Sequence, residues 1–289
     1  MRRGGSFLLD GTPIGRLLVY RGARRQVEKK TGSHYPAPLR AIEVVRTSLA
    51  HGMARGLEAE TQAFGELAMT DVSRRLVEVF FATNEIKKDD GVLPGHGRAR
   101  PVRRLGIIGS GFMGSGIAGT AVAHAGVEVR LKDADLGKVG RGLKAATDIL
   151  TMQLSRRRIT PYEYARKRAY LSGSGGFDGF GSADIVIEAV FEELAIKRQV
   201  IADVESAIPV TTVIATNTST LPIHEIASAV HHPERVLGMH FFSPVEKMPL
   251  LEVIPTGVTS GDAIVTAVQF GRRMGKTVIV VADSPGFWV

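Results

Sequence analysis

The chain has no cysteine, one tryptophan and few aromatic residues, which make up 6% of the sequence. Without cysteine there are no disulfides, no thiolate metal ligands and no cysteine nucleophile, and we expect a reducing, cytoplasmic location. No window approaches roughly eighteen uncharged apolar residues, so we expect no membrane span. The start at Met1–Gly5 lacks the apolar run of a signal peptide. His231 and His232 have no third ligand at metal spacing, so we predict no metal site.

The composition is that of an ordinary globular chain, with 44% hydrophobic and 23% charged residues among 289. The net charge of +8 is unevenly distributed along it. Residues 1–100 hold 17 Lys and Arg against 11 Asp and Glu, whereas residues 101–289 hold 20 against 18. The basic excess has no interleaved aromatic residues and no nucleic-acid-binding signature, so we expect a solvated surface and no nucleic-acid partner.

The chain divides near residue 95. Residues 91–101 are rich in glycine, proline and charge, which predicts an exposed linker between a helical segment (1–100) and an α/β domain (101–289). Three helices are expected upstream, over 13–29, 39–69 and 70–88, the first begun by Thr12-Pro13 and the last capped by Thr70. Three helices cannot enclose a large core, so we expect this segment to lie against another domain.

Downstream, short apolar runs alternate with helical patterns, which indicates a doubly wound, mostly parallel sheet. Strands are expected near 103–109, 127–133, 184–189, 212–216, 235–242, 249–255 and 276–282, and helices near 112–125, 135–154, 193–207, 223–230 and 260–274. The stretch 135–170 is longer than a simple crossover needs, so we expect a protruding helical hairpin. Residues 173–181 are rich in glycine and follow no clear strand, so we expect a flexible loop.

The most informative motif follows the first of these strands. Gly109, Gly111 and Gly114 have the spacing G-x-G-x-x-G between a strand and a helix, and Asp133 ends the second strand. The glycines allow a sharp turn, close approach of a pyrophosphate and tight helix packing, while the helix N-terminus favours the phosphates. A carboxylate at Asp133 accepts hydrogen bonds from ribose hydroxyls and repels a 2′-phosphate, which favours NAD over NADP. The predicted cofactor-binding turn comprises Gly109, Gly111, Phe112, Met113 and Gly114.

A histidine and a glutamate in adjacent strands are the candidates for catalysis. His240 lies near the end of one expected strand and Glu252 lies in the next, with a proline-bounded turn between them. A hairpin-like return over these residues can bring the two side chains together. A carboxylate on one imidazole nitrogen fixes the tautomer and makes the other nitrogen a better general base. Such a pair suits alcohol oxidation beside a nicotinamide, although alone it is more often structural.

Five ordered segments resemble the NAD-binding domain of 3-hydroxyacyl-CoA dehydrogenase over residues 101–289, which implies a Rossmann-type fold. They are Gly109–Ala118, Asp184–Glu192, Ala215–Ser219, His240–Glu252 and Ser284–Phe287. Residues 1–100, including Tyr35–Pro38 and Phe80–Thr83, resemble the region that joins the hydratase and dehydrogenase parts of the multifunctional fatty-acid oxidation alpha subunit. Ser243 stands where monofunctional members often have Asn and multifunctional members commonly have Ser.

The resemblance implies roles for individual residues. His240 would be the base and Glu252 its partner, and Ser219 would hydrogen-bond the substrate 3-oxygen. Asn217 would lie beside the nicotinamide, and Glu192 with Lys197 would lie near cofactor and substrate. The implied reaction is the NAD-dependent oxidation of (S)-3-hydroxyacyl-CoA in fatty-acid β-oxidation, with a thiolase-type subunit as a possible partner.

The chain also departs from this family. Members continue after the Pro-Gly-Phe segment with a substrate-contacting asparagine and a helical domain, whereas this chain stops at Val289. It begins after the hydratase core, so we expect an internal piece of a larger enzyme. We also expect an exposed apolar surface that includes Val278–Val281 and Phe287–Val289. Two alternatives remain. The motifs favour an oxidoreductase, whereas the missing helical domain favours an NAD-binding fragment without turnover as the behaviour of this chain alone.

Overall fold

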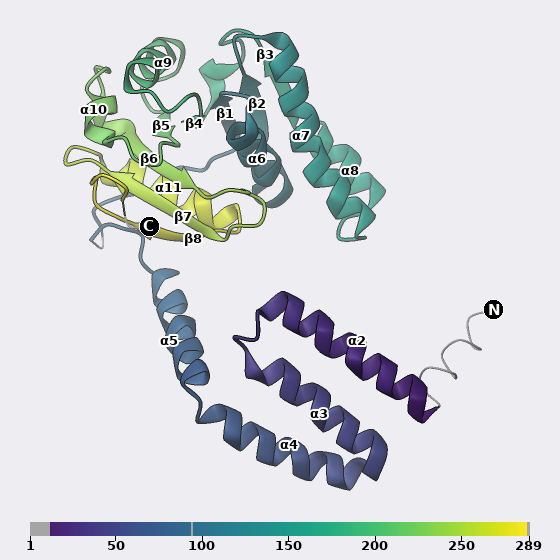
Figure 1. The fold of residues 1–289 in the computed structure, drawn as a ribbon. Coiled ribbons are helices and arrows are strands. Elements are labelled where there is room, and N and C mark those ends of the chain that lie inside the picture. Colours follow the sequence, from purple (N-terminus) through teal and green to yellow (C-terminus); the bar gives the residue numbers. More distant parts are fainter. Residues whose placement is uncertain (1–11, 94, 288–289) are drawn as a thin grey trace. The chain divides into compact units, whose positions relative to one another are not determined.

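The computed structural model describes residues 12–93 and 95–287 (Figure 1). Two compact units are distinguished, residues 1–84 and 85–289. Within the described residues, no helix is long and apolar enough to cross a membrane.

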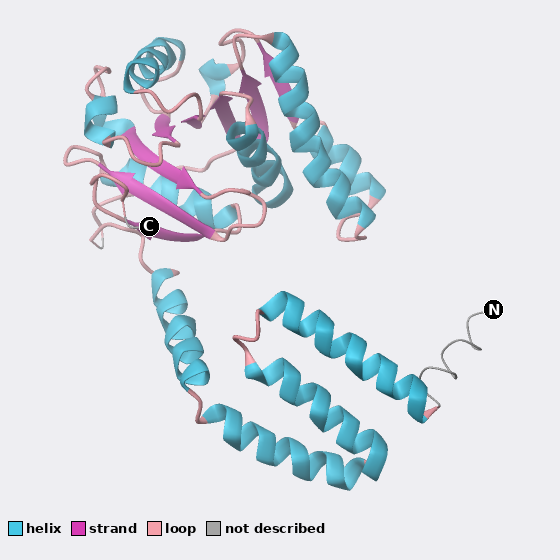
Figure 2. Cartoon of the chain, in the orientation of Figure 1, coloured by secondary structure: helices cyan, strands magenta, loops and turns pink. Residues whose placement is uncertain are grey.

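The first unit is helical (Figure 2). Its helices are α2 (Pro13–Thr31), α3 (Pro36–His51), α4 (Met53–Ala68) and α5 (Asp71–Ile86), the last of which ends just beyond the unit boundary. Thr12 caps α2, because its hydroxyl accepts a hydrogen bond from the backbone N–H of Gly15 at 3.0 Å. The predicted single helix over 39–69 is wrong. It breaks at Gly52, whose φ of 89° and ψ of 169° are accessible essentially to glycine alone.

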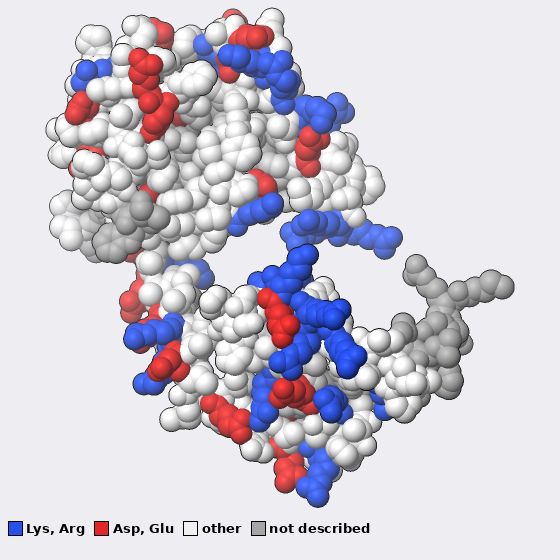
Figure 3. Space-filling view, viewed as in Figure 1, with Lys and Arg blue, Asp and Glu red and all other residues white. Residues whose placement is uncertain are grey.

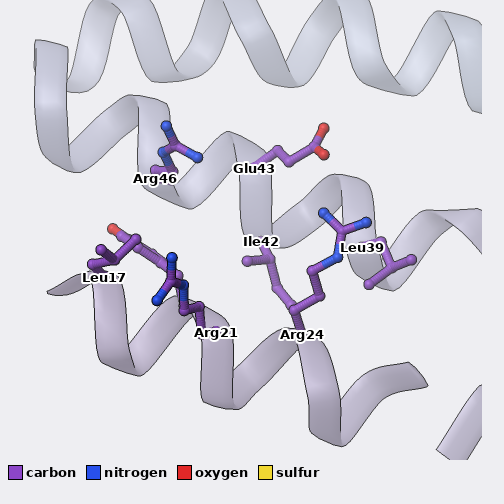
Figure 4. Close-up of a pocket in the computed structure, with 8 residues that line it drawn as sticks. Leu17, Arg21, Arg24, Leu39, Ile42, Glu43 and Arg46 are labelled. Atoms are coloured by element: carbon purple, nitrogen blue, oxygen red, sulfur yellow. The ribbon is translucent and has the colours of Figure 1, made fainter. Parts of the chain in front are cut away.

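The helical unit buries few side chains. Among its described helical residues only Gly15, Gly56 and Ala63 are buried. At Gly56 an added Cβ would lie 2.5 Å from the Cβ of Ser48, so glycine permits the close packing of α3 and α4. A cavity of about 220 Å³ lies between α2 and α3, with guanidinium groups at its rim (Figure 4). The small core agrees with the expectation that these helices cannot enclose a large one. That the helical segment lies against another domain stays a prediction.

The charges of the helical unit are mixed rather than of one sign (Figure 3). Many of its arginines pair with a carboxylate on the same or a neighbouring helix: Arg24–Glu28, Arg40–Glu43, Arg40–Glu66, Arg55–Glu58, Arg74–Asp71 and Arg75–Glu78. Exposed pairs of this kind contribute about 0–1 kcal/mol each. The basic excess is therefore a solvated, partly neutralised surface.

The second unit is built on one eight-stranded sheet. Its strands are β1 (Arg104–Ile108), β2 (Glu128–Lys132), β3 (Leu171–Ser174), β4 (Ile185–Glu188), β5 (Val213–Thr216), β6 (Val236–Phe241), β7 (Leu250–Pro255) and β8 (Thr277–Val280). Their order is β3-β2-β1-β4-β5-β6-β7-β8, and every pair is parallel except β6–β7. The doubly wound, mostly parallel Rossmann-type prediction is confirmed.

Helices cover both faces of the sheet. They are α6 (Phe112–Thr120), which continues as a π-helical turn to Ala125, α7 (Leu136–Ser155), α8 (Pro161–Arg168), α9 (Leu194–Ala207), α10 (Ile223–Ala227) and α11 (Gly261–Arg273). Strand residues alternate between two apolar cores: Ile185 and Ile187 join the core with α6, α7 and α11, and Val186 joins the core with α9 and α10. The predicted hairpin over 135–170 is confirmed as α7 and α8.

The expectation of a flexible loop from residue 173 is partly wrong. Gly173 lies within β3 and pairs with Leu131 of β2. The strand Leu171–Ser174 has no β-branched residue, so it lacks the usual strand signal. Gly173 is required there because an added Cβ would lie 2.4 Å from a methyl carbon of Val139 on α7.

The unit boundary also differs from the predicted division near residue 95. The backbone N–H groups of Arg98 and Arg100 donate to Asp262 and Thr266 of α11, at 2.9 and 3.0 Å. Arg272 of the same helix pairs with Asp90 at 2.5 Å. Glycine and proline predicted an irregular, exposed segment, but its binding to α11 depends on distant residues. It belongs to the α/β unit.

Candidate active site

The candidate site lies where parallel strands end. β1 has β2 on one side and β4 on the other, so the connections on its two sides run in opposite directions along the sheet. Ligands of doubly wound sheets bind at the carboxyl end of such a switch point. The glycine turn follows β1, Asp133 follows β2, and the segments after β4, β5 and β6 complete the same edge.

The glycine turn has the geometry that the sequence predicted. Gly109 has φ of 97°, and an added Cβ would lie 2.4 Å from the carbonyl oxygen of Ala189. At Gly114 a Cβ would lie 1.8 Å from the carbonyl oxygen of Gly109. At Gly111 an added Cβ would meet nothing within 4 Å. Gly109 and Gly114 are therefore needed for the turn itself, whereas Gly111 leaves space open at the start of α6.

The residues between these glycines begin α6. Phe112 is exposed, and Met113 is half-buried against the larger apolar core. Gly111 precedes α6 and provides no side-chain cap, and the first N–H groups of a helix have no acceptor within the helix. A helix start of this kind attracts phosphate.

Asp133 is held beside this turn by Ser110. Its Oδ2 atom accepts hydrogen bonds from the backbone N–H and the hydroxyl of Ser110, at 3.0 and 2.8 Å. Burial would raise the pKa of Asp133, but the hydrogen bonds from Ser110 and from the backbone of Asp135 lower it below its usual value. The carboxylate is ionised at neutral pH, and since it has about four lone-pair sites, it retains capacity for a ribose hydroxyl.

These features fit a dinucleotide. The open space at Gly111 suits a pyrophosphate at the start of α6, and the ionised Asp133 suits the adenosine ribose. When bound, NAD would accept a hydride at its nicotinamide ring.

His240 and Glu252 contact one another across the antiparallel pair. They are register partners in β6 and β7, and the Nδ1 atom of His240 lies 2.7 Å from Oε2 of Glu252. The Glu252 side chain is fully buried, and that of His240 is 13% exposed. In the tautomer that donates the Nδ1 proton to Oε2 of Glu252, Nε2 is left as the basic nitrogen.

Two phenylalanine rings lie near the imidazole of His240. The ring centroids of Phe242 and Phe287 are 4.4 and 5.8 Å from the imidazole centroid. Both rings contact the imidazole at a tilt, so they limit its rotation and its access to water. Phe287 belongs to the Ser284–Phe287 segment that the sequence singled out, whereas residues 288 and 289 lie outside the described residues.

Glu192 organises the segment after β5. Its Oε1 atom accepts hydrogen bonds from the hydroxyl of Thr218 at 2.5 Å and from the backbone N–H and hydroxyl of Ser219 at 2.7 and 3.2 Å. Burial would raise the pKa of Glu192, but these hydrogen bonds and the charge of Lys197 lower it. Ser219 is exposed, so its hydroxyl can reach a ligand.

Asn217 links the same segment to the strand of His240. Its side-chain oxygen accepts a hydrogen bond from the backbone N–H of Phe241 at 2.9 Å. The backbone N–H of Asn217 donates to the backbone carbonyl of Glu188 at 2.8 Å. Asn217, Ser219 and His240 are thus connected at one edge of the sheet.

The sequence did not single out Glu188 as a site residue. Its side chain is buried at the end of β4 and pairs with the fully buried Lys197, at 2.9 and 3.1 Å. Lys197 also lies 3.2 Å from Glu192. Lys197 is therefore beneath the surface of the site rather than on it. A glutamate inside the apolar run Ile185–Ala189 was a usable signal, because charged residues are almost never fully buried unless paired.

Comparisons with known proteins agree with this geometry. Residues 104–284 match the family described as 3-hydroxyacyl-CoA dehydrogenase, NAD binding domain. Among solved structures, FadB2 of M. tuberculosis is 34% identical, with a TM-score of 0.62, over 66% of this chain and 67% of that one. The (S)-3-hydroxybutyryl-CoA dehydrogenase PaaH1 of Ralstonia eutropha is 32% identical, with a TM-score of 0.63, over 65% of this chain and 66% of that one.

A third structure, 3-hydroxybutyryl-CoA dehydrogenase of Escherichia coli, is 32% identical, with a TM-score of 0.62, over 65% of this chain. The matched region spans only 39% of that chain, and about two thirds of the other two. The match covers the glycine turn, Asp133 and the His240–Glu252 pair. The chain belongs to the 3-hydroxyacyl-CoA dehydrogenase family through its NAD-binding domain.

Proposed function

We propose that this protein oxidises (S)-3-hydroxyacyl-CoA to 3-oxoacyl-CoA with NAD, as a step of fatty-acid β-oxidation. The observation that carries the proposal is the 2.7 Å contact between His240 and Glu252, at the sheet edge that also holds the dinucleotide turn. Two of the relatives named above are 3-hydroxybutyryl-CoA dehydrogenases, which supports a short-chain hydroxyacyl-CoA as the first substrate to test.

The oxidation requires a proton acceptor, and the His240–Glu252 pair can provide it. As the C3–H bond of the alcohol releases a hydride to NAD, the 3-hydroxyl must lose its proton. Nε2 of His240 accepts that proton, and the carboxylate of Glu252 stabilises the imidazolium through Nδ1. Because Glu252 is fully buried and is the register partner of His240, its carboxylate also fixes the orientation of the ring.

Ser219 and Asn217 complete the proposed site. Ser219 is exposed and its hydroxyl can turn from Glu192 to the substrate 3-oxygen, where negative charge develops. Asn217 is held between β4 and β6 by its two hydrogen bonds, so we place it beside the nicotinamide. Ser243 further supports membership of the multifunctional subgroup, for which a thiolase-type partner and a cytoplasmic location remain predictions.

Turnover of 3-hydroxybutyryl-CoA tests the proposal. Purified protein, NAD and (S)-3-hydroxybutyryl-CoA are expected to produce NADH, and the (R) enantiomer is the matched control. If the protein bound NAD but formed no NADH from short-chain or long-chain (S)-3-hydroxyacyl-CoA, the proposed turnover would be refuted. The protein would then be an NAD-binding protein without this activity.

A further inference from the structure

We propose that Glu188 is a positioning residue, which acts through Lys197 to hold Glu192 and the Ser219 segment in the geometry that the reaction needs. The inference rests on the proposed function, because Ser219 is there assigned to the substrate oxygen. Glu188 does not touch the space at the sheet edge, since its side chain is only 1% exposed.

Lys197 links two carboxylates of different burial. Its Nζ atom lies 2.9 Å from the buried Glu188 and 3.2 Å from Glu192, whose side chain is 37% exposed. Lys197 itself is fully buried. The ammonium therefore connects the interior of the sheet to a carboxylate that reaches the site.

Glu188 is a well-anchored end of this link. Besides Lys197, it accepts hydrogen bonds from the backbone N–H of Val190 at 2.6 Å and from the hydroxyl of Thr216 at 2.7 Å. These contacts tie the ends of β4 and β5 to α9. A buried charge is tolerated only when its hydrogen-bonding capacity is filled in this way.

Glu192 connects Lys197 to the segment that contains Ser219. One of its oxygen atoms receives all three hydrogen bonds from Thr218 and Ser219, and the other lies against Lys197. Without the ammonium, the carboxylate of Glu192 has no cation to fix the direction of its second oxygen. The segment that it holds, including the backbone N–H of Ser219, then loses its fixed position. A misplacement of about 1 Å at a substrate-positioning group is sufficient to impair catalysis.

A buried ion pair can instead serve stability alone, and a double variant separates the two roles. Glu188→Gln removes the buried partner of Lys197 and leaves the ammonium beside the partly exposed Glu192, whereas Lys197→Met leaves the buried Glu188 without its cation. Each variant is therefore expected to destabilise the protein. The double variant removes both charges and is expected to regain most of the stability. Its kcat is nevertheless expected to stay at least about tenfold below that of the wild type, because Glu192 still lacks its cation. Recovery of kcat together with stability would show a structural role only and overturn the proposal.

Glu192→Gln tests the same link without disturbing the buried pair. It is expected to lower kcat about as much as the double variant, and adding it to the double variant is expected to cause little further loss, as for residues that act through one path. An unchanged kcat in Glu192→Gln would refute the proposal even if the double variant failed to fold. The matched control is Glu205→Gln, which breaks the Glu205–Arg235 pair elsewhere on α9 and should lower stability without changing kcat.

Amide hydrogen exchange of residues 216–221, measured by mass spectrometry, provides a readout independent of turnover. The double variant is expected to exchange faster in this segment, because the Ser219 N–H loses its fixed acceptor, and Glu205→Gln is not. If the wild type proved inactive, faster exchange would support the positioning role while the proposed function failed. Unchanged exchange in the double variant would reject the positioning role itself.

Discussion

The Nδ1 atom of His240 lies 2.7 Å from Oε2 of Glu252, and the two residues are direct register partners in the antiparallel β6–β7 pair. The contact is therefore built into the sheet rather than into a loop. A slip of the register by one residue would turn Glu252 to the opposite face. Because β6 is parallel to β5 and β7 is not, the pair stands at the only antiparallel step among the described strands of the sheet.

Replacement of the base should abolish most turnover. His240→Gln keeps a polar side chain of similar size but cannot accept the proton of the 3-hydroxyl at neutral pH. We expect kcat for (S)-3-hydroxybutyryl-CoA to fall at least about a hundredfold, as is usual for loss of a general base. NAD affinity, measured by titration calorimetry, should change little. A variant with near-normal kcat would exclude His240 as the base.

Glu252→Gln tests the partner separately. The amide retains the shape of the side chain but removes the charge that stabilises an imidazolium. We expect folding to persist and kcat to fall strongly, with the loss greatest where deprotonation of the alcohol limits the rate. Circular dichroism and urea unfolding check the fold. Full activity in a folded Glu252→Gln variant would limit Glu252 to a structural role.

The glycines of the turn should respond in different ways. Gly111→Val places its side chain in open space, since a Cβ there meets nothing within 4 Å. The fold should persist, whereas NAD binding should be lost because the side chain occupies the position of the pyrophosphate. Gly114→Ala instead brings a Cβ within 1.8 Å of the Gly109 carbonyl oxygen and should destabilise the protein itself. If a folded Gly111→Val variant still bound NAD in calorimetry, the assignment of the pyrophosphate site to this turn would be wrong.

Asp133 predicts selectivity for NAD over NADP. Hydrogen bonds from Ser110 keep the pKa of Asp133 low despite its burial, so the carboxylate is charged where a 2′-phosphate would have to bind. Titration calorimetry should show clearly weaker binding of NADP than of NAD. Asp133→Asn should narrow that difference by removing the repulsion. Equal affinities of the wild type for both dinucleotides would remove this role from Asp133.

Local patterns in the sequence were enough for much of the site. The glycine spacing, the acid at the end of the second strand and the two residues twelve apart in adjacent strands each depend on nearby sequence alone. The partners of buried charges do not. Glu188 contacts Lys197 of α9 and Thr216 of β5. Neither contact follows from the spacing of residues within one helix or strand, so the sequence pattern did not predict them.

The fold shows the same division. Alternating apolar runs predicted seven strands, but the edge strand Leu171–Ser174 pairs on one side only and needs little apolar character. The apolar spacing over 39–69 continues across Gly52, and the turn there follows from the backbone angles of a single glycine. The docking of residues 91–101 on α11 rests on hydrogen bonds between residues more than a hundred positions apart.

Glu205 is expected to make the stability of the protein sensitive to acid. Burial would raise the pKa of Glu205, but hydrogen bonds from His231, His232 and Arg235 lower it from 4.5 to about 2. A carboxyl group whose pKa is lower in the folded state stabilises that state above the unfolded pKa. This contribution is lost as the pH falls from 4.5 towards 2.

Glu205→Gln should therefore lower the free energy of unfolding at neutral pH by roughly 1–3 kcal/mol. It should also reduce the loss of stability between about pH 5 and pH 3, which urea unfolding at several pH values measures. The control is Asp148→Asn, since the Lys144–Asp148 pair is exposed and should contribute little. If Glu205→Gln and the wild type lost stability in parallel across this range, the hydrogen bonds to Glu205 would not be the source of its acid sensitivity.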